Sequence, residues 1–466
     1  MSEQTIERLP LADAQPLLVP ARGIRLTRRA VQALYAGGHA GAVWLPCFAA
    51  LSGRGSATTA FALATIAAAV WLLTLHVAFA AVRVTRLALG AAVGAAVGAA
   101  GGLVVVSALD AWVAGVAYGH WTLLGMTAGV FVLSGSWEAL VAGAPALRQR
   151  VLVVGARSGG IELVTELRAV EECPFELVGI VDDEHEGGEI GGVPVHGTID
   201  DLAAIVEAQQ PDLVVLAVDE NRPEAFSKLL DVAGAGFKVI GLAQFYEHAF
   251  GRVPVSTVSP AWFMGVLHLY RRPYTRFAKR AFDVAVASVG LALAAPLFPL
   301  LALLVKRTPG PVIFRQTRLG EGGRHFTIYK FRTMRQDAEA AGAIWASERD
   351  PRITTLGRFM RKTRLDELPQ LWNVLKGDMS IVGPRPERPE FVDLLQETVP
   401  FWSRRHLVKP GITGWAQVRR GYTADASGTA EKLAYDLWYL RHRSLVVDLA
   451  ICVKTFTTLV TGAGAR

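Results

Sequence analysis

The hydrophobic and polar positions of the chain divide its N-terminal third into four apolar runs. A polar stretch, residues 1–29, precedes runs at about 30–51, 57–82, 87–109 and 113–133. Each run reaches the roughly 20 residues that an α-helix needs to cross the hydrocarbon core of a bilayer. The pattern therefore predicts four transmembrane helices.

Arginine residues gather at alternate ends of these runs. Four precede the first run, pairs follow the second and fourth runs, and one lies in an opposite loop: Arg22, Arg25, Arg28 and Arg29, then Arg83 and Arg86, then Arg148 and Arg150, and Arg54. Basic residues concentrate on the cytoplasmic side of membrane proteins. We therefore predict a four-helix transmembrane bundle over residues 30–147, with both of its ends in the cytoplasm.

Small residues form a regular stripe in the third run. Glycine recurs at every fourth position, at Gly90, Gly94, Gly98 and Gly102, which is about once per helical turn. Such a stripe lets a second helix approach closely. The second helix is either a neighbour in the same chain or the same helix of another copy, so a homodimer is one of two interpretations.

From residue 148 to about 245, short β-rich runs alternate with helical windows. VLVVGARSGG opens this part, and ELVGIVDDE, PDLVVLAVDE and FKVIGLA follow. The alternation predicts a parallel α/β sheet of the Rossmann type. Gly155 and Gly160 suit a phosphate turn and Asp182 suits a ribose hydroxyl. However, Arg157 stands where G-x-G-x-x-G needs its second glycine. We interpret the domain as structural or regulatory, with nucleotide or effector binding as the alternative.

A fifth apolar run, residues 283–305, is long enough to cross a membrane as one straight helix. Pro296 and Pro299 interrupt it, and a proline inside a helix removes a backbone donor and clashes with the preceding turn. Basic pairs flank both ends, at 279–280 and 306–307, so both ends are predicted to lie on the cytoplasmic side. We therefore expect a bent, re-entrant membrane helix, with a straight crossing as the alternative.

Composition agrees with a membrane protein. Hydrophobic residues make up 52% of the 466 residues and charged residues 19%, and the mean hydropathy of +0.32 is too high for an ordinary soluble enzyme. The net charge of +7 suits cytoplasmic flanks of membrane helices, and no basic helix or aromatic signature indicates nucleic-acid binding. Cys47, Cys173 and Cys452 form no C-x-x-C pair, so neither a zinc site nor a disulfide framework is predicted.

The segment from Arg358 to Arg388 mixes basic and acidic residues. It holds seven Lys or Arg and four Asp or Glu, and its arginines and Gly-Pro-Arg-Pro turn suit a phosphate ligand. A carboxylate facing a phosphate is repulsive unless it holds a divalent cation or attacks the phosphorus. Adjacent Asp366 and Glu367 suit these two separate roles. A helix is predicted to begin near Leu368. The alternative to a catalytic role is therefore that the two carboxylates only cap the N-terminus of this helix.

Three sequence motifs, in the order in which a known family has them, resemble that family. KFRTM from Lys330, TRLDELPQLWNVLKGDMSIVGPRP from Thr363 and KPGITGWAQV from Lys409 closely resemble the bacterial sugar transferase family of polyprenyl-phosphate phosphoglycosyl transferases. The resemblance covers about residues 276–460. The four spans and the central α/β domain resemble long members, which include undecaprenyl-phosphate glucose and galactose phosphotransferases. One departure is Ala295, where some members carry serine; it affects the geometry of the bend and not the chemistry.

The resemblance implies a reaction. Members transfer a sugar 1-phosphate from a nucleoside diphosphate sugar, here expected to be a UDP-hexose, to undecaprenyl phosphate and release UMP. By resemblance, Asp366 attacks the β-phosphorus to form an aspartyl phosphosugar, and Glu367 helps to hold Mg²⁺. The substrate phosphates are expected to meet five basic residues: Lys330, Arg332, Arg364, Arg385 and Arg388. The implied step is the first membrane step of exopolysaccharide, capsule or O-antigen synthesis.

The predicted organisation thus has a linker at 246–275 and a catalytic part at 276–466, in which a small α+β domain follows the re-entrant helix. Residues 310–334 of this part are predicted to form two strands about a glycine-rich turn. Lys330 and Arg332 stand at alternate positions, so they are expected to share one face. The catalytic domain is expected on the cytoplasmic side of a bacterial inner membrane that the chain crosses several times. Two other functions stay open. One is an inactive membrane scaffold for polysaccharide assembly, and the other is a membrane-anchored nucleotide-sugar oxidoreductase. The chain has no Tyr-x-x-x-Lys, which counts against a short-chain dehydratase.

Overall fold

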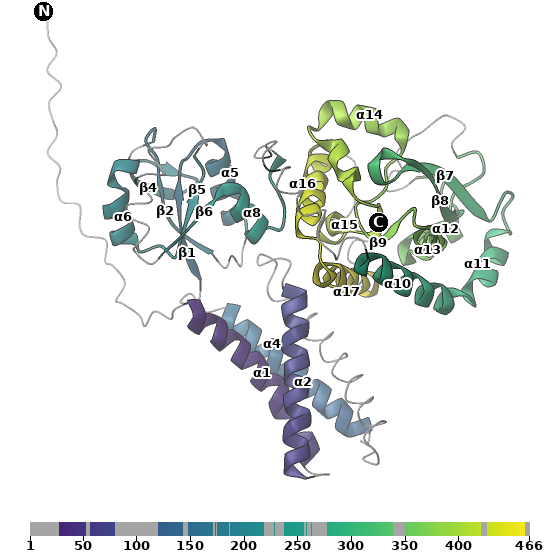
Figure 1. Cartoon of the computed structure of the whole chain (residues 1–466), viewed down its shortest axis with the longest axis horizontal. Coiled ribbons are helices and arrows are strands. Elements are labelled where there is room, and N and C mark those ends of the chain that lie inside the picture. The colour runs from purple at the N-terminus through teal and green to yellow at the C-terminus, as the bar shows by residue number, and fades with distance from the viewer. Residues whose placement is uncertain are drawn as a thin grey trace, which may run out of the picture.

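The computed structural model describes residues 28–52, 56–79 and 120–142, and most of 148–461. The longer gaps in this last part lie at 219–227, 229–236, 263–276, 339–349 and 421–425. The predictions for residues 1–27, for the run at 87–109 and for its glycine stripe fall outside the described residues. Figure 1 shows three parts: a group of helices, an α/β sheet, and a larger C-terminal part.

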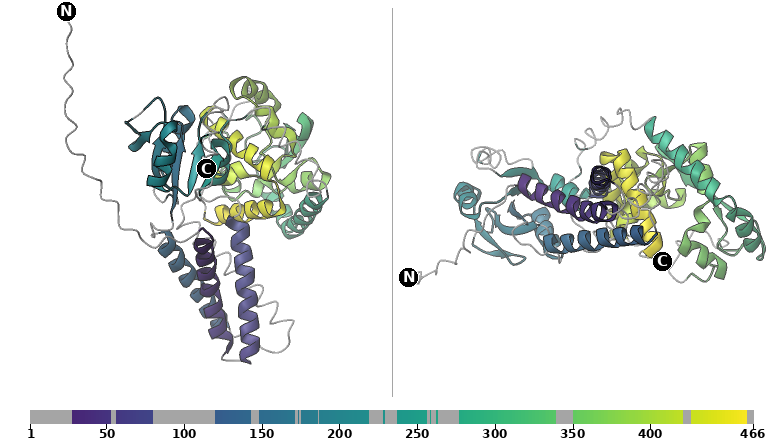
Figure 2. Two further views of the ribbon diagram at one scale, coloured as in Figure 1. Left: turned by 60° about the vertical axis from the view of Figure 1, so that its left-hand side comes forward. Right: turned by 90° about the horizontal axis from the view of Figure 1, so that it is seen from below.

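The helical group contains α1 (Arg28–Ser52), α2 (Ala57–Phe79) and α4 (His120–Ala142). α1 contacts both other helices, and all three project to one side of the rest of the protein (Figures 1 and 2). Gly38 lies directly against the ring of Trp137, whose Nε1 donates to the carbonyl of Tyr35 at 3.3 Å. Glycine here permits the close approach of α1 and α4.

These helices follow the apolar runs with one shift. The fourth run was expected to end near residue 133, whereas α4 continues to Ala142, because the helix-forming sequence WEALVA precedes Gly143. Within the described residues, one helix, Ala33–Ser52, has the length and hydropathy needed to cross a bilayer by itself. The bundle of four spans therefore stays a prediction.

The α/β part is a mostly parallel sheet, as predicted. Its strands lie in the order β3-β4-β2-β1-β5-β6, and β3 alone of the described strands in this sheet is antiparallel to its neighbour. Their bounds are β1 Gln149–Val154, β2 Phe175–Val181, β3 Glu189–Ile190, β4 Val193–Gly197, β5 Leu213–Leu216 and β6 Lys238–Gly241.

Helices cover both faces of this sheet. Val151 and Val153 of β1 pack on one face with α5 (Ser158–Arg168) and α8 (Leu242–Ala249). The alternate residues Leu152 and Val154 pack on the other face with α6 (Leu202–Gln209), which follows the 3₁₀ turn Ile199–Asp201. Successive strand residues point to opposite faces, and both faces are apolar, as a buried parallel sheet requires.

The turn after β1, which nucleotide or effector binding would require, makes hydrogen bonds and an ion pair within the protein. Gly155 has φ 99°, a backbone region that glycine adopts without strain. Asp182 Oδ1 accepts a hydrogen bond from the amide of Ala156 at 2.9 Å, and Oδ2 lies 2.7 Å from His185 Nδ1. Arg157 pairs with Glu184 at 2.9 Å. The Asp182 carboxylate, which suits a ribose hydroxyl in the alternative interpretation, is thus already hydrogen-bonded within the turn.

The segment from α8 to Val253 joins two hydrophobic cores. Phe245 and Phe250 pack in the core of the sheet, whereas Val253, which is fully buried, packs in the core of the C-terminal part. The amide of Val253 donates to Ala434 O at 3.0 Å, and Trp438 Nε1 donates to Glu247 O at 2.9 Å. The start of the segment predicted as a linker is therefore a packed connection.

The C-terminal part combines a hairpin, a small parallel sheet and surrounding helices. The hairpin pairs β7 (Ile313–Leu319) with β8 (His325–Phe331) about a glycine-rich turn, as predicted. The other elements are α12 Thr355–Thr363, α13 Gln370–Lys376, β9 Ser380–Val382, α14 Pro389–Thr398, β10 Gly411–Thr413, α15 Trp415–Arg420, α16 Ala426–His442 and α17 Leu445–Thr461, with 3₁₀ turns at Glu321–Gly323, Leu365–Glu367 and Trp402–Leu407.

The fifth apolar run bends at Pro296, as predicted, whereas Pro299 lies in the first turn of the helix that follows. α10 (Ala278–Ala294) and α11 (Leu297–Val305) meet at 66°, and Pro296 lies at the break. Leu293 and Leu303 are 74% and 66% exposed, so large apolar side chains point away from the protein on both limbs. Insertion of this bent pair into one leaflet of a membrane stays a prediction.

Candidate active site

Asp366 and Glu367 lie in a tight turn between two helices. Arg364 ends α12 in the left-handed region at φ 57°, and the 3₁₀ turn Leu365–Glu367 follows directly. α13 then begins at Gln370, two residues later than predicted, with Pro369 as its N-cap. The left-handed residue breaks the helical path, so the two carboxylates stand in a turn rather than inside a helix. Both side chains are buried.

Glu367 is surrounded by cations. Its Oε1 lies 3.0 Å from Lys330 Nζ, 2.9 Å from Arg385 Nη2 and 3.7 Å from Arg364 Nη1. Burial would raise the pKa of Glu367, but Lys330, Arg385 and Arg364 outweigh it and hold the pKa well below its usual range. Glu367 is therefore ionised at neutral pH, and it gathers three of the predicted phosphate-binding residues in one place.

Asp366 has a different environment although it is the adjacent residue. Its Oδ1 is buried and makes no hydrogen bond within the described part of the chain. Burial, followed by repulsion from Glu367, raises the pKa of Asp366 to about 6. An ionised oxygen without a donor is a better nucleophile than one held by hydrogen bonds, and carboxylates with displaced pKa values are typical of functional sites.

Asn373 explains why Lys330 faces the carboxylate turn. From α13, its Oδ1 accepts from the amide of Tyr329 at 3.1 Å and its Nδ2 donates to Thr327 O at 2.7 Å. The side chain thus occupies two backbone groups of β8 and fixes this strand on α13. Lys330 follows Tyr329 directly, so its ammonium group is carried to Glu367.

The Gly-Pro-Arg-Pro turn has no regular secondary structure, yet its backbone is held at every carbonyl from Pro384 to Glu387. The donors come from separate segments: Gly411 N to Pro384 O at 2.9 Å, Arg405 Nη2 to Arg385 O at 3.1 Å, Arg318 Nη1 to Pro386 O at 3.1 Å, and Leu319 N to Glu387 O at 3.1 Å. The Arg385 guanidinium is therefore presented to Glu367 from a fixed backbone.

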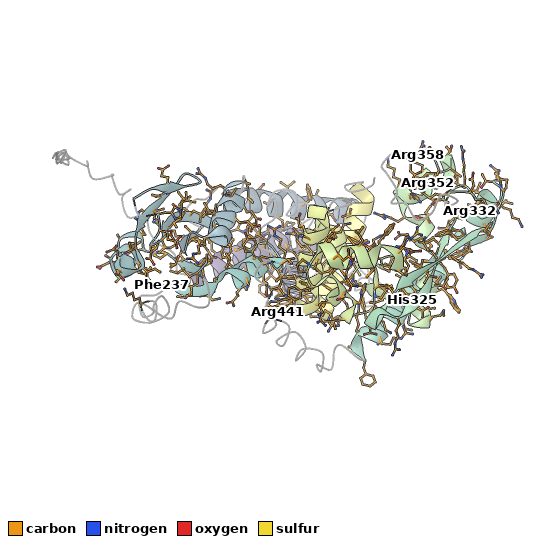
Figure 3. All side chains as sticks on the ribbon, turned by 90° about the horizontal axis from the view of Figure 1, so that it is seen from above. Phe237, His325, Arg332, Arg352, Arg358 and Arg441 are labelled. Carbon is orange, nitrogen blue, oxygen red and sulfur yellow. The ribbon has the colours of Figure 1, made fainter. Side chains whose placement is uncertain are left out.

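Arg332 is placed differently from the prediction. Its guanidinium donates to the carbonyls of Val305, Thr308 and Pro311 at 3.2, 2.8 and 2.8 Å, and also to that of Pro309. β8 ends at Phe331, so the alternation that was to put residues 330 and 332 on one face no longer applies. Arg332 instead stabilises the exit from α11, at the outer end of the C-terminal part (Figure 3).

Arg388 stands beyond the Gly-Pro-Arg-Pro turn, before α14. Its Nη2 lies 3.4 Å from Glu390 Oε1, and its guanidinium lies over the ring of Phe391 at 5.5 Å. A role for Arg388 in phosphate binding stays a prediction. The residues that the structure brings together with Asp366 and Glu367 are Lys330, Arg364 and Arg385.

Sequence reasoning missed two contributors to the site. Arg361, in the last turn of α12, donates to Thr333 Oγ1 at 2.9 Å and lowers the pKa of Asp366; its position shortly before the carboxylates was the available signal. Arg405 pairs with Asp436 at 2.7 Å, and both side chains are 2% exposed. Because Arg405, Asp436 and Arg385 are far apart in sequence, no local pattern indicates that they meet.

Glu367 fits a magnesium ion whose remaining ligands would be substrate oxygens and water. Mg²⁺ in phosphate-transfer sites is bound by one or two carboxylates together with substrate phosphates. The described residues contain no group of three or more His, Cys, Asp or Glu side chains that could hold a metal ion alone. The anionic Glu367 would supply a protein ligand for such an ion, and the unpartnered Oδ1 of the adjacent Asp366 is left for the attack on phosphorus.

Comparison with known proteins bears on the same residues. The model of the family described as bacterial sugar transferase matches residues 274–462, which include every residue of the site. UDP-glucose:undecaprenyl-phosphate glucose-1-phosphate transferase of Escherichia coli is 34% identical over 315 residues, which are 66% of this chain and 67% of that protein. The chain belongs to the bacterial sugar transferase family.

Other relatives of this family member match over shorter shares of their length. UDP-N-acetylgalactosamine-undecaprenyl-phosphate N-acetylgalactosaminephosphotransferase of Aeromonas hydrophila is 45% identical over 50% of this chain and 54% of its own. Undecaprenyl-phosphate glucose phosphotransferase of Komagataeibacter xylinus is 33% identical over 66% of this chain and 58% of its own. The chain thus spans little more than half the length of these two relatives. A family model described as a CoA-binding domain matches residues 60–231.

Proposed function

We propose that this family member transfers a sugar 1-phosphate from a UDP-hexose to undecaprenyl phosphate and releases UMP. The observation that carries the proposal is the pairing of a buried, unpartnered carboxylate oxygen, Asp366 Oδ1, with an adjacent carboxylate that gathers three cations. The relatives' names speak of UDP-sugar donors and undecaprenyl-phosphate acceptors. Because those names differ in the sugar, we propose only the class of hexose.

In the first step, an oxygen of Asp366 attacks the β-phosphorus of the donor. The new bond joins this oxygen to phosphorus, and the bond from phosphorus to the bridging oxygen breaks, so UMP leaves with that electron pair. Lys330 and Arg385 stabilise the charge on the phosphoryl oxygens, because preorganised cations act where charge develops. At neutral pH, Asp366 is ionised, since its pKa of about 6 lies below that pH.

In the second step, an oxygen of undecaprenyl phosphate attacks the same phosphorus. The bond between phosphorus and Asp366 breaks, and the carboxylate is regenerated. Glu367 would help to hold Mg²⁺, which supplies Lewis-acid stabilisation of phosphate charge when bound. A carboxylate nucleophile divides one difficult displacement into two easier ones.

The proposed setting is the cytoplasmic face of a bacterial inner membrane, at the first membrane step of exopolysaccharide synthesis. It is supported by the helix Ala33–Ser52 and by the bent pair α10–α11, whose outer side chains are apolar and exposed. The lipid acceptor is bound to a membrane, so an enzyme that uses it gains from an apolar surface beside its active site. A four-span bundle and a homodimer remain part of this proposal.

The test is trapping of the intermediate. Wild-type protein given UDP-hexose labelled in the β-phosphate, without lipid acceptor, is expected to carry label on the protein. Asp366→Asn is expected to carry none and to lose transfer, because an amide cannot form the acyl phosphate. If Asp366 were only a helix cap, the loss would be about 1 kcal/mol of stability with turnover intact. Normal turnover by Asp366→Asn would refute the covalent route.

A further inference from the structure

Two basic residues open α10, where a helix disfavours them. Lys279 and Arg280 lie in the first turn, and the macrodipole places partial positive charge at this end. As a membrane flank they would face water and lipid headgroups. Instead, Lys279 Nζ lies 2.6 Å from Asp448 Oδ2 and 3.2 Å from Asp283 Oδ1. The unfavourable position is therefore offset by contacts within the protein.

Arg280 binds the C-terminal end of α13. Its Nη1 and Nη2 donate to the carbonyls of Val374 and Leu375, at 2.6 Å each. The last carbonyls of a helix lack hydrogen-bond partners within the helix and form the negative end of its dipole. A guanidinium supplies both the hydrogen-bond donors and the positive charge. Further along α10, Gly290 leaves room for Leu371, since a Cβ at position 290 would lie 3.2 Å from it. α10 is thus attached to the helix that directly follows the carboxylate turn.

Asp283, one turn further along α10, binds the other half of the site. Its Oδ1 accepts hydrogen bonds from Ser380 Oγ and from the amide of Ile381, both at 3.0 Å, and the side chain is 4% exposed. These two residues begin β9, which leads directly into the turn that carries Arg385. One helix therefore holds the element behind the carboxylates and the element before the arginine.

The opposite side of the same helix is apolar and exposed. The outward side chains on α10 and α11 are Val289, Leu293, Leu300 and Leu303, at 60%, 74%, 53% and 66% exposure. We propose that Arg280 is a positioning residue for the step that uses the lipid acceptor. Through α13 it holds the carboxylate–cation cluster on α10, a frame whose other side is apolar. This inference rests on the proposed function.

The two half-reactions place different demands on such a frame. The nucleotide sugar arrives from water and can follow the cluster wherever it lies. The acceptor phosphate is held at the membrane surface by its own chain, so it cannot follow. A misplacement of about 1 Å can reduce a rate by about 100-fold. Loss of the Arg280 contacts should therefore slow the attack of the acceptor phosphate on the Asp366 phosphosugar more than it slows the formation of that phosphosugar.

The experiment compares Arg280→Ala with wild type in vesicles. We expect label from the donor to appear on Arg280→Ala nearly as fast as on wild type, whereas transfer to undecaprenyl phosphate falls about ten- to 100-fold. Arg280→Lys should recover part of this loss, because an ammonium group can still donate to a carbonyl of α13. The control is Arg307→Ala, which removes an exposed cation at the other end of the bent pair and should transfer like wild type.

Equal loss of labelling and transfer in Arg280→Ala, or no loss of either, would overturn the inference. A short-chain prenyl phosphate in detergent is a second readout, because it can approach the cluster freely, and there the variant should lie within about threefold of wild type. If wild type turns over without any label, the covalent route has failed instead. In that case the KM values test the inference: Arg280→Ala should raise the KM for the lipid acceptor and leave the KM for the donor unchanged. Any other result would overturn it.

Discussion

Glu367→Gln tests how one carboxylate sets the protonation of the other. In the wild-type site, burial and the negative charge of Glu367 together raise the pKa of Asp366 from 3.8 to about 6. This difference of about two units corresponds to about 3 kcal/mol of preference for the protonated form. Glutamine has nearly the same shape as glutamate but no charge, so it removes the repulsion and leaves the burial.

The variant should lower the pKa of Asp366. Three cations near Glu367 would lose their partner, and Lys330 and Arg385 already favour the ionised form of Asp366. We expect a decrease of about one unit, or about 1.4 kcal/mol. In the proposed mechanism Asp366 attacks only when it is deprotonated, so activity should fall as the pH falls through the pKa of Asp366. The acidic limb of the wild-type profile should therefore lie near pH 6, and that of Glu367→Gln near pH 5.

The assay is UMP release, followed as kcat/KM against pH, because this ratio reports the pKa values of the free enzyme. Each profile is normalised to its own plateau, since Glu367→Gln should also reduce the rate and the response to Mg²⁺. Glu321→Gln, which removes an equal charge from an exposed turn, is the control and should keep the wild-type limb. An acidic limb that stays in place or moves upward in Glu367→Gln would refute this electrostatic account.

Two further predictions concern topology and domain structure. Cysteines at Phe277, which is 82% exposed, and at Arg307 should react alike with an impermeant thiol reagent from the cytoplasmic side; labelling of either from the periplasm would mean that α10–α11 crosses the membrane. Deletion of residues 1–270 should lower the Tm of the catalytic part more than deletion of 1–241, because it removes buried Val253, worth about 1.5–3 kcal/mol. Equal Tm values would contradict the packed connection.

The sequence alone determined those parts of the fold that local patterns control. Alternating short runs predicted the parallel sheet, and glycine between two strand-like runs predicted the β7–β8 hairpin. Pro296 predicted the bend of the fifth apolar run, because a proline inside a helix lacks the backbone donor and clashes with the preceding turn. The adjacent carboxylates were likewise chosen as the candidate site from sequence, since the chemistry proposed for them depends on residue type and immediate neighbours.

Only the tertiary structure decided which cations belong to the site. Lys330 and Arg332 are two residues apart, yet the strand ends between them, so one faces Glu367 and the other holds the exit of α11. Lys279 and Arg280 are a basic pair in sequence, but they bind separate buried partners. A long cationic side chain reaches whichever acceptor the fold brings near, and its sequence position does not fix that acceptor.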